Sequence, residues 1–471
     1  MLQEDLRCLL PADAILTASS ELAVYECDGF TIEKKQPDVV VFPTSTQQIV
    51  EIVKICHKHG VPFIPRGAGT SLAGGCLPVG GGVMIALTRM KRILEIDYRN
   101  RYAVVEPGLV NLWLTNQLKP HGFHYAPDPS SQGACTIGGN VATNSGGPHT
   151  LKYGVTVNHV LGVEFVLPDG EVCTVGGPLG DYLGCDLVGT LVGSEGTLGI
   201  ASKIWVRITR NPQAYCTLLG VFANVEDATN CISDIIGAGI IPAALEMMDQ
   251  LIIQAVEAAF HFGFPLDAGA VLIMEVDGLA AGLEEEAERI SQLAMKNGAR
   301  EVRRAKTDAE RQKLWKCRKQ AFGAVGRLAP SYCTQDGVVP RTRLPQMLRR
   351  IQEIGQQHQL RIANVFHAGD GNLHPIILFD ERDADQVKRV LEASHAILEE
   401  CLAAGGSVTG EHGIGVEKLD FMPRMFAPED LGMMLRLRQA LNPNNACSPG
   451  KMLPTAGACI EATKAGRKAA L

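Results

Sequence analysis

The chain of 471 residues is long enough for two or three domains at about 150 residues each. Its 46% hydrophobic and 20% charged residues provide enough apolar surface for folded cores, which excludes extended disorder. The net charge of −7 arises from intermixed acidic and basic residues, which excludes the basic field that nucleic-acid binding requires. We therefore expect a globular protein with no nucleic-acid partner.

Cysteine usage and hydrophobic runs indicate where the protein works. The 14 cysteines are scattered without a Cys-x-x-Cys pair, which favours reduced thiols over a metal ribbon or a disulfide framework. The N-terminal residues are acidic and lack the pattern of a signal peptide, and the longest apolar runs, such as Ala270–Met274, are too short to span a bilayer. We expect a cytoplasmic protein without direct membrane insertion, which reaches a membrane only through partner subunits.

Residues 1–210 are predicted to form a glycine-rich α+β domain. A strand at Val39–Phe42 precedes a helix that a Thr44–Gln47 capping box begins and Gly60 ends. A second strand, Val61–Pro65, runs directly into a glycine-rich loop, which places that loop at the carboxyl end of a strand. Short strands separated by Gly, Asn, Pro and Ser are expected further on, at Val83–Leu87, Ala103–Glu106, Val163–Leu167, Glu171–Thr174 and Ile204–Ile208.

Residues 211–435 are predicted to form a second α+β domain, because glycine becomes sparser and charged helices alternate with strands such as Val271–Val276. The expected helices are Ala281–Asn297, Asp308–Arg327, Leu344–His358 and Asp383–Ala404. Residues 436–471 are expected to form a C-terminal segment with long loops.

Three stretches of small residues in the first domain can bring a large ligand close to the backbone. The first, Arg66–Gly75, is similar to a dinucleotide fingerprint, but Leu72 stands where the third glycine belongs and no helix is expected to follow. Its backbone N–H groups can instead converge on a pyrophosphate, and a structural turn is the plain alternative. Two further stretches, Pro127–Gly147 and Gly193–Ile200, contain few large side chains. Three such loops in one domain favour a bound cofactor.

A strand–turn–strand pattern in the second domain carries two histidines. If a hairpin turns about residues 370–371, His367 and His374 lie opposite each other with their imidazoles on one face. The pair Glu411 and His412, flanked by glycines, adds a carboxylate and a third imidazole. Two histidines and one glutamate suit a divalent ion such as Zn²⁺, whereas each histidine taken singly is more often a structural residue.

Sequence motifs identify the family that the chain resembles. The stretches PRGAGTSLAGG, PDPSSQGACTIGGNVATNSGG and GSEGTLGI occur in the order found in the vanillyl-alcohol-oxidase-like FAD-binding fold. Nearly the whole chain resembles the FAD-linked D-2-hydroxyacid dehydrogenases, a family that includes glycolate oxidases. The resemblance implies an α+β fold in which residues 1–210 bind FAD, residues 211–435 form a substrate (cap) domain with an antiparallel sheet, and residues 436–471 return toward the FAD domain.

The resemblance also implies the contacts of the cofactor. FAD would be dissociable, because some relatives form a covalent link through a histidine that the first glycine loop lacks here. The residues implied are Arg66, Gly67, Ala68, Gly69, Thr70 and Ser71 at the pyrophosphate, Pro129, Thr136, Gly139, Asn140 and Gly146 at the flavin, and Glu195 and Ile200 at the adenosine side.

A metal centre is the next implication of the resemblance. His367, His374 and Glu411 would bind a divalent ion, for which Zn²⁺ is expected and Mn²⁺ or Fe²⁺ are alternatives. Such an ion lowers the pKa of a hydroxyl group that it binds. His412 would then be the general base that removes the hydroxyl proton of the substrate.

Two further residues are implied in substrate binding. Arg318 would pair with the substrate carboxylate, although an arginine on such a charged helix is usually solvated, and Asn372 would present its amide. Relatives that act on 2-hydroxyglutarate carry a lysine where this chain has Thr334, so a second carboxylate is poorly provided for. Ser448 is another departure, because relatives have an asparagine there.

We therefore expect FAD-dependent oxidation of a small D-2-hydroxy acid, glycolate or D-lactate, to the 2-oxo acid. Hydride would pass to the flavin, since no side chain accepts it. The expected partners are a second FAD-binding subunit and an iron–sulfur subunit, because the cysteines of this chain show no iron–sulfur pattern. Two alternatives stay open: a non-catalytic FAD subunit for electron relay or assembly, and a flavin-free metal hydrolase.

Overall fold

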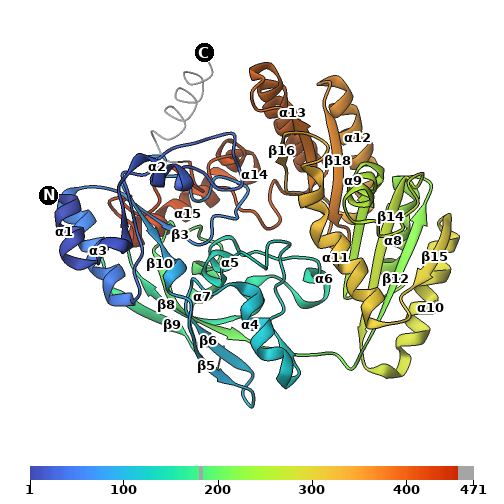
Figure 1. Cartoon of the computed structure of the whole chain (residues 1–471), viewed down its shortest axis with the longest axis horizontal. Helices are drawn as coiled ribbons and strands as arrows, with labels where there is room; N and C mark the ends of the chain where they lie inside the picture. Colours follow the sequence, from blue (N-terminus) through green and yellow to red (C-terminus); the bar gives the residue numbers. More distant parts are fainter. Residues whose placement is uncertain (180–183, 455–471) are drawn as a thin grey trace. The chain divides into compact units, whose positions relative to one another are not determined.

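The computed structural model describes residues 1–179 and 184–454, and the chain folds as two compact units (Figure 1). Unit 1 contains residues 1–146, 154–210 and 411–454, and unit 2 contains residues 147–153 and 211–410. The boundary after residue 210 coincides with the expected one, whereas residues 411–435, expected in the second domain, lie in unit 1. The chain passes between the units at residues 146–147, 153–154, 210–211 and 410–411.

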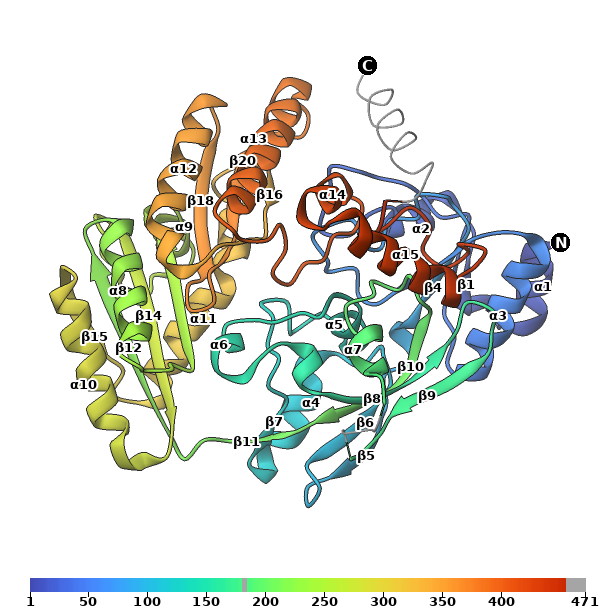
Figure 2. The same cartoon turned by 180° about the vertical axis from the view of Figure 1, so that it is seen from behind.

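Unit 1 is built on two main sheets (Figure 2). The first comprises, in spatial order, β1 (Ile15–Leu16), β2 (Val39–Val41), β4 (Val83–Ala86) and β3 (Phe63–Arg66), of which the last three are parallel. The second is antiparallel and comprises β5 (Ile93–Asp97), β6 (Tyr102–Val105), β10 (Ile200–Arg207), β8 (Val160–Val166) and β9 (Val172–Gly176). A separate short ladder pairs β7 (Phe123–His124) with β11 (Thr209–Arg210).

The helices of unit 1 are mostly short. They are α1 (Leu2–Leu9), α2 (Ser19–Leu22), α3 (Thr46–His59), α4 (Asn111–Leu118), α5 (Ile137–Thr143), α7 (Leu187–Leu191), α14 (Met422–Met425) and α15 (Pro428–Leu441). Gly60 ends α3 in the left-handed conformation, as predicted. The predicted capping box is one residue out of register, because Ser45 caps α3 by accepting from Gln48 N at 3.3 Å, and Gln48 Oε1 accepts from Thr44 N at 2.7 Å.

The C-terminal part of unit 1 joins its N-terminal half. The backbone of Cys447 forms an isolated parallel β-bridge with Phe63 of β3, and Ser448 N donates to the carbonyl oxygen of Phe63 at 2.9 Å. Lys451 is fully buried, and its Nζ donates to Gly75 O at 2.8 Å. Burial lowers the pKa of this lysine to about 8. Residues from both ends of the sequence therefore share one core, which contains Phe63 and Cys447 together.

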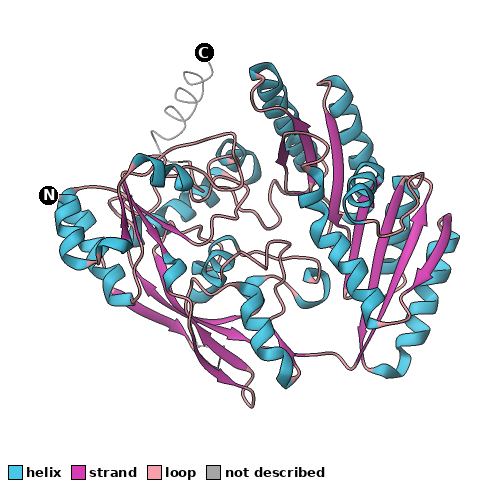
Figure 3. Cartoon of the chain, viewed as in Figure 1, coloured by secondary structure: helices cyan, strands magenta, loops and turns pink. Residues whose placement is uncertain are grey.

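Unit 2 is built on a nine-stranded sheet in which the described pairings are antiparallel, as expected (Figure 3). Its main path comprises β15 (Ala299–Arg304), β12 (Ala214–Phe222), β14 (Ala270–Gly278), β13 (Ala244–Asp249), β18 (Arg361–His367), β19 (Asn372–Leu373) and β17 (Gly337–Val338). A branch comprises β20 (Pro375–Phe379), which pairs with β18, and β16 (Ser331–Thr334). The predicted α+β class with an antiparallel cap sheet is confirmed.

Helices cover both faces of this sheet. One face carries α8 (Val225–Gly237), α10 (Ala280–Lys296), α12 (Leu344–Gln357) and α13 (Ala384–Ala403), and the other carries α9 (Gln250–Phe260) and α11 (Asp308–Val325). The last four of the predicted helices, α10 to α13, lie within two residues of their expected ends. No helix in the described ranges combines the length and the apolar character needed to cross a membrane.

Residues 147–153, which include α6 (Thr150–Tyr153), leave unit 1 and pack within unit 2. Lys152 Nζ and Tyr153 Oη both donate to the carboxylate of Asp277, the latter at 2.6 Å. The ring of His149 lies on Trp315, with 5.1 Å between the ring centroids. These polar and aromatic contacts fasten the short segment to β14 and α11.

Glu275 on β14 is fully buried beneath α11. Arg311 donates to its carboxylate through Nε at 2.8 Å and Nη2 at 2.7 Å, Trp315 Nε1 donates at 2.7 Å, and Thr217 Oγ1 donates at 2.5 Å. Burial by itself raises the pKa of Glu275, but hydrogen bonds from His149 and Arg311 outweigh it and lower the pKa to about 2. The folded protein therefore holds this carboxylate charged at neutral pH.

The variant Glu275→Gln is expected to lower the free energy of unfolding at pH 7 by about 3 kcal/mol, because it leaves Arg311 without its buried partner. The folded pKa lies below the unfolded value of 4.5, so the stabilising contribution is complete above that value and is lost as the pH falls toward 2. Urea unfolding should show a smaller difference between the two proteins at pH 3 than at pH 7. The control Glu284→Gln removes an exposed partner of Arg304 and should change little; an equal difference at both pH values would contradict the assignment.

Candidate active site

The first glycine loop begins where β3 ends. Arg66 is buried, donates from Nη1 to Cys27 O at 2.9 Å, and places its guanidinium 5.4 Å from the centre of the Tyr25 ring. Gly69 has a φ of 71°, and a Cβ at this position would collide with the guanidinium of Arg66. The side chain of Arg66 therefore braces the loop that the sequence assigns to a pyrophosphate.

The second glycine loop lies against the first. A Cβ at Gly67 would come within 2.5 Å of Thr136 Oγ1, so the two loops leave no room for a side chain between them. Thr136 caps α5 by accepting from Gly139 N at 3.2 Å, and Asn140 Oδ1 accepts from Asn111 Nδ2 at 2.9 Å. The side chains of Thr136 and Asn140 thus hold the loop itself. Their predicted place at the flavin stays a prediction.

Other residues of the predicted cofactor set occupy structural positions. Pro129 is buried, and its carbonyl oxygen accepts from Gln132 N at 2.8 Å. Ile200 is 1% exposed and belongs to the apolar core at the start of β10. Ala68, Thr70 and Ser71 follow Arg66 along the first loop and are partly or fully exposed. Exposed small residues beside a braced backbone fit a ligand that approaches the main chain.

Glu195 has a role that the sequence did not indicate. Its carboxylate accepts from Ile414 N and from Gly415 N, each at 2.7 Å. Burial raises the pKa of Glu195, and these two backbone hydrogen bonds oppose that effect. A Cβ at Gly413 would come within 2.8 Å of the same carboxylate, so the glycine permits the close approach. Glu195 therefore holds the loop that carries Glu411 and His412.

The loop of residues 411–415 also contacts the first and the second glycine loop within unit 1. Glu411 Oε2 accepts from Gly146 N at 3.0 Å, and the carbonyl oxygen of His412 accepts from Ser71 Oγ at 3.4 Å. Unit 1 thus brings together the three stretches assigned to a cofactor and the Glu411–His412 pair.

The predicted histidine hairpin exists in unit 2, with a different register. β18 pairs with β19 so that His367 lies opposite Asn372, not opposite His374 as expected. His374 follows β19 directly, and its ring still meets that of His367, with 5.0 Å between the centroids and nearly perpendicular planes. Ligating atoms of the two histidines lie within 4.8 Å of each other. Both side chains are buried, and their closeness suits two ligands of one ion.

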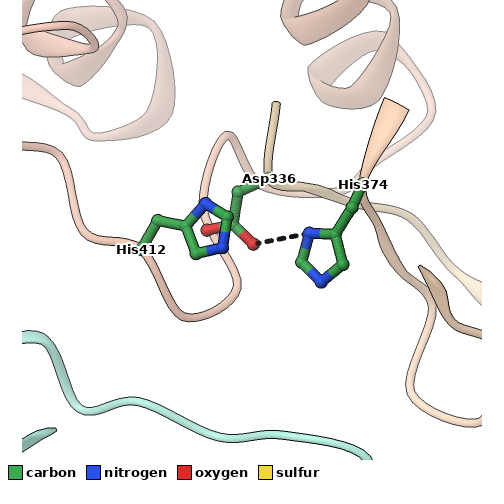
Figure 4. Close-up of side chains that lie close together, drawn as sticks. All are labelled: Asp336, His374 and His412. Atoms are coloured by element: carbon green, nitrogen blue, oxygen red, sulfur yellow. Dashed lines mark ion pairs between the residues drawn. The ribbon is translucent and has the colours of Figure 1, made fainter. Parts of the chain in front are cut away.

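A buried carboxylate lies close to the Nδ1 atom of each of these histidines. His367 Nδ1 is 2.8 Å from Glu246 Oε1 on β13, and His374 Nδ1 is 3.8 Å from Asp336 Oδ1 (Figure 4). Carboxylates in this position fix the tautomer and the orientation of a ligating imidazole. Sequence reasoning missed both acids. A lone acid in the apolar run Ala243–Met248 was the available signal for Glu246.

Asp336 also fixes the point where the chain leaves unit 2. Its Oδ2 accepts from Thr409 Oγ1 at 2.8 Å and from Gly410 N at 2.9 Å. Glu411 and His412 follow Gly410 directly in the chain. The acid behind His374 therefore also anchors the residues from which the Glu411–His412 loop begins.

Arg318, in the middle of α11, is fully buried although its helix is charged. Its Nε forms an ion pair with Glu246 Oε2 at 2.6 Å, and none of its three guanidinium nitrogens makes a hydrogen bond among the described residues, so Nη1 and Nη2 are left without any partner there. The side-chain oxygen of the buried Asn372 also lacks one in that part of the chain. Buried donors and acceptors that lack a hydrogen-bond partner within the protein are suited to a polar ligand such as a carboxylate. The sequence-based expectation that an arginine here is usually solvated does not hold.

Comparisons with known proteins agree along the chain. A family described as FAD linked oxidases, C-terminal domain, matches residues 211–452, and an FAD binding domain matches residues 37–176. Glycolate oxidase subunit GlcD of Escherichia coli K12 is 44% identical over 97% of this chain and 91% of its own length. The mitochondrial D-lactate dehydrogenase [cytochrome] of Arabidopsis thaliana is 32% identical over 89% of this chain and 74% of its own.

Solved structures share the fold at low identity. p-Cresol methylhydroxylase with bound substrate superposes with a TM-score of 0.80 and 17% identity over 96% of each chain. Alkyldihydroxyacetonephosphate synthase gives a TM-score of 0.74 and 19% identity over 95% of this chain and 84% of that one. The vanillyl-alcohol-oxidase type of FAD-binding fold expected from the motifs is thereby confirmed.

The variant Gly69→Val is expected to empty the FAD site, because a side chain at this φ displaces Arg66 from the first glycine loop. Flavin absorbance per mole of purified protein measures the loss. The control Gly122→Val has a similar φ of 76° but no atom within 4 Å of the added Cβ, so it introduces backbone strain without the collision. Equal flavin content in the two variants would refute the placement of the loop.

Proposed function

The chain belongs to the family of FAD-linked oxidases, and we propose that it oxidises a small D-2-hydroxy acid, glycolate or D-lactate, to the 2-oxo acid. The observation that carries the proposal is the buried Arg318, whose two terminal nitrogens lack partners among the described residues. A buried guanidinium with an unused end is expected to bind a carboxylate. Curated relatives named as glycolate oxidase subunits and D-lactate dehydrogenases support the same substrate class.

The loops of unit 1 fit FAD. Arg66 braces a positive-φ loop, and the contact between Gly67 and Thr136 keeps the two glycine loops free of side chains at their junction. We infer that the first loop binds the pyrophosphate through backbone N–H groups, and that FAD is held without a covalent bond. Arg66 supplies a positive charge beside that loop.

The donor set of unit 2 fits a divalent ion. His367 and His374 are buried, lie close together, and each has a carboxylate behind it. In this proposal Glu411 completes the set, because it follows Gly410, which Asp336 holds. Two imidazoles and one carboxylate suit Zn²⁺, Mn²⁺ or Fe²⁺ and leave positions for substrate oxygens.

The residues of the chain divide the work on the substrate. Arg318 binds the carboxylate through Nη1 and Nη2 and so orients the α-carbon, and Asn372 contacts the hydroxyl end. The imidazole of His412 takes the proton from the hydroxyl oxygen, and the α-hydrogen leaves with its electron pair. When bound, FAD supplies the hydride acceptor and the ion a Lewis acid.

The lining of unit 2 limits the size and charge of the substrate. Thr334 is buried and uncharged, whereas relatives that act on 2-hydroxyglutarate carry a lysine at this position to bind the second carboxylate. Phe322, one turn beyond Arg318 on α11, meets the ring of His374 at 6.2 Å between centroids. An aromatic wall and a neutral hydroxyl favour a short acid with a hydrogen or a methyl group beyond the α-carbon.

Electrons leave the flavin through partners in this proposal. The described cysteines form no disulfide and no cluster motif, and two relatives are named as subunits of a glycolate oxidase. We propose a second FAD-binding subunit and an iron–sulfur subunit as partners. Turnover of the isolated chain with oxygen as sole acceptor should therefore be slow.

Anaerobic glycolate or D-lactate is expected to bleach the flavin absorbance of the purified protein, because hydride passes to FAD. 2-Hydroxyglutarate should reduce it far more slowly, since Thr334 offers its second carboxylate no charge. A colourless preparation that binds a divalent ion would instead indicate a metal hydrolase. Yellow protein that no hydroxy acid bleaches would indicate an electron-relay subunit.

His374→Ala and His412→Ala should have different consequences, because one residue is a proposed ligand and the other a proposed base. His374→Ala should lose the bound metal and substrate affinity, whereas His412→Ala should keep metal and FAD and reduce the flavin at least about 100-fold more slowly. Metal analysis and stopped-flow reduction measure both effects. If His412→Ala proves metal-free while His374→Ala keeps its metal, the two roles must be exchanged.

A further inference from the structure

Glu246 is a fully buried carboxylate on β13 whose two oxygens face two different site residues. Its Oε1 is 2.8 Å from His367 Nδ1 and its Oε2 is 2.6 Å from Arg318 Nε. The strand register supports the first contact, because Glu246 lies directly opposite His367 in the β13–β18 ladder. One side chain therefore touches both the proposed metal ligand and the proposed carboxylate anchor.

The contact with His367 decides which ring nitrogen can bind an ion. A carboxylate at Nδ1 keeps the proton on that nitrogen, so Nε2 is the nitrogen that serves as a ligand. The negative charge also makes the imidazole a better donor to a cation.

The contact with Arg318 decides which edge of the guanidinium faces the substrate. Because Nε is engaged by Glu246, the edge formed by Nη1 and Nη2 remains for a bidentate carboxylate. Glu246 also compensates the charge of Arg318, which a fully buried arginine requires before any acid is bound.

We propose that Glu246 is a positioning residue that sets the metal ligand and the carboxylate anchor relative to each other. The inference rests on the proposed function of His367 and Arg318. A rigid carboxylate between them holds the metal-bound end and the carboxylate end of the substrate in one fixed geometry. Both contacts lie within unit 2, so the arrangement exists on the cap by itself.

The same face of α11 supplies a matched comparison. Arg311, Trp315 and Arg318 recur at the spacing of one helical face. The first two donate hydrogen bonds to Glu275, and Arg318 forms an ion pair with Glu246. Glu275 is equally buried and also lies on a strand of the same sheet. Its removal disturbs a buried ion pair without touching His367 or Arg318.

The test replaces Glu246 with Gln and measures binding, not turnover. Zn²⁺ affinity is determined by competition with a chelator, and oxalate affinity, in excess Zn²⁺, from the change in the flavin spectrum. Oxalate is a small acid without an α-hydrogen and cannot be oxidised by hydride loss. Glu246→Gln should weaken Zn²⁺ binding by about 10- to 100-fold and weaken oxalate binding as well, with FAD content unchanged.

Three other variants separate the two contacts. Arg318→Met should lose oxalate affinity and keep Zn²⁺ affinity, His367→Ala should lose Zn²⁺ affinity, and Glu275→Gln should keep both. If Glu246→Gln fails to fold, the double variant Glu246→Gln/Arg318→Met removes both charges and carries the test. Its Zn²⁺ affinity should lie below that of Arg318→Met alone.

Two results would overturn the inference. Glu246→Gln with wild-type affinity for both probes would show that the carboxylate positions neither residue. Equal losses in Glu246→Gln and Glu275→Gln would show a general effect of destabilising the sheet. Wild-type protein that binds no divalent ion would refute the metal site of the proposed function itself, which is a different outcome from either.

Discussion

A carboxylate buried in a sheet domain destabilises the fold unless a cation and hydrogen-bond donors are buried with it, and unit 2 satisfies this requirement twice along one face of α11. Near the start of the helix, Arg311 neutralises the charge of Glu275 on β14, and Trp315 donates a hydrogen bond to the same carboxylate. Two turns later, Arg318 neutralises Glu246 on β13 and leaves its far edge unused. The first pair is complete and structural, whereas the second is incomplete. That difference, produced by one helix across neighbouring strands, distinguishes a scaffold contact from the proposed binding site.

The chain is fixed by an acidic side chain on each side of the Glu411–His412 loop, within unit 2 before the loop and within unit 1 after it. Before it, Asp336 of unit 2 binds the backbone and side chain of the two preceding residues. After it, Glu195 of unit 1 accepts from the two backbone N–H groups at residues 414 and 415. Acidic side chains therefore fix the backbone on each side, and the glycine at position 413 permits the close approach. The proposed base, His412, and the proposed ligand, Glu411, would gain a fixed orientation from these anchors.

The sequence predicted most of the regular structure and the closeness of His367 and His374, while the roles of the candidate site residues stay predictions. Amphipathic periodicity placed α10 to α13 within two residues, because those helices bury one face against the sheet. The hairpin register was missed, because a two-residue strand such as β19 leaves the pairing of His367 to tertiary contacts. Glu195, Glu246 and Asp336 were missed as anchors of the site for a related reason. Their partners are 38 to 220 residues away, beyond the reach of any local pattern.

The bridge between Phe63 and Cys447 and the contact of Lys451 with Gly75 join residues that the ribosome makes far apart in time. Non-local pairings of this kind slow folding, because the entropy of closing a long loop is lost before the contacts between its ends can stabilise the structure. Residues 211–410 are synthesised between the two parts of unit 1. All strands of unit 2 have therefore been made before the last residues of unit 1 are available for folding. The first glycine loop gains its contact with Lys451 only after residue 451 has emerged from the ribosome. If this loop binds FAD as proposed, stable FAD uptake is expected to be a post-translational event, and a chain truncated before this lysine would lack the contact that completes the loop.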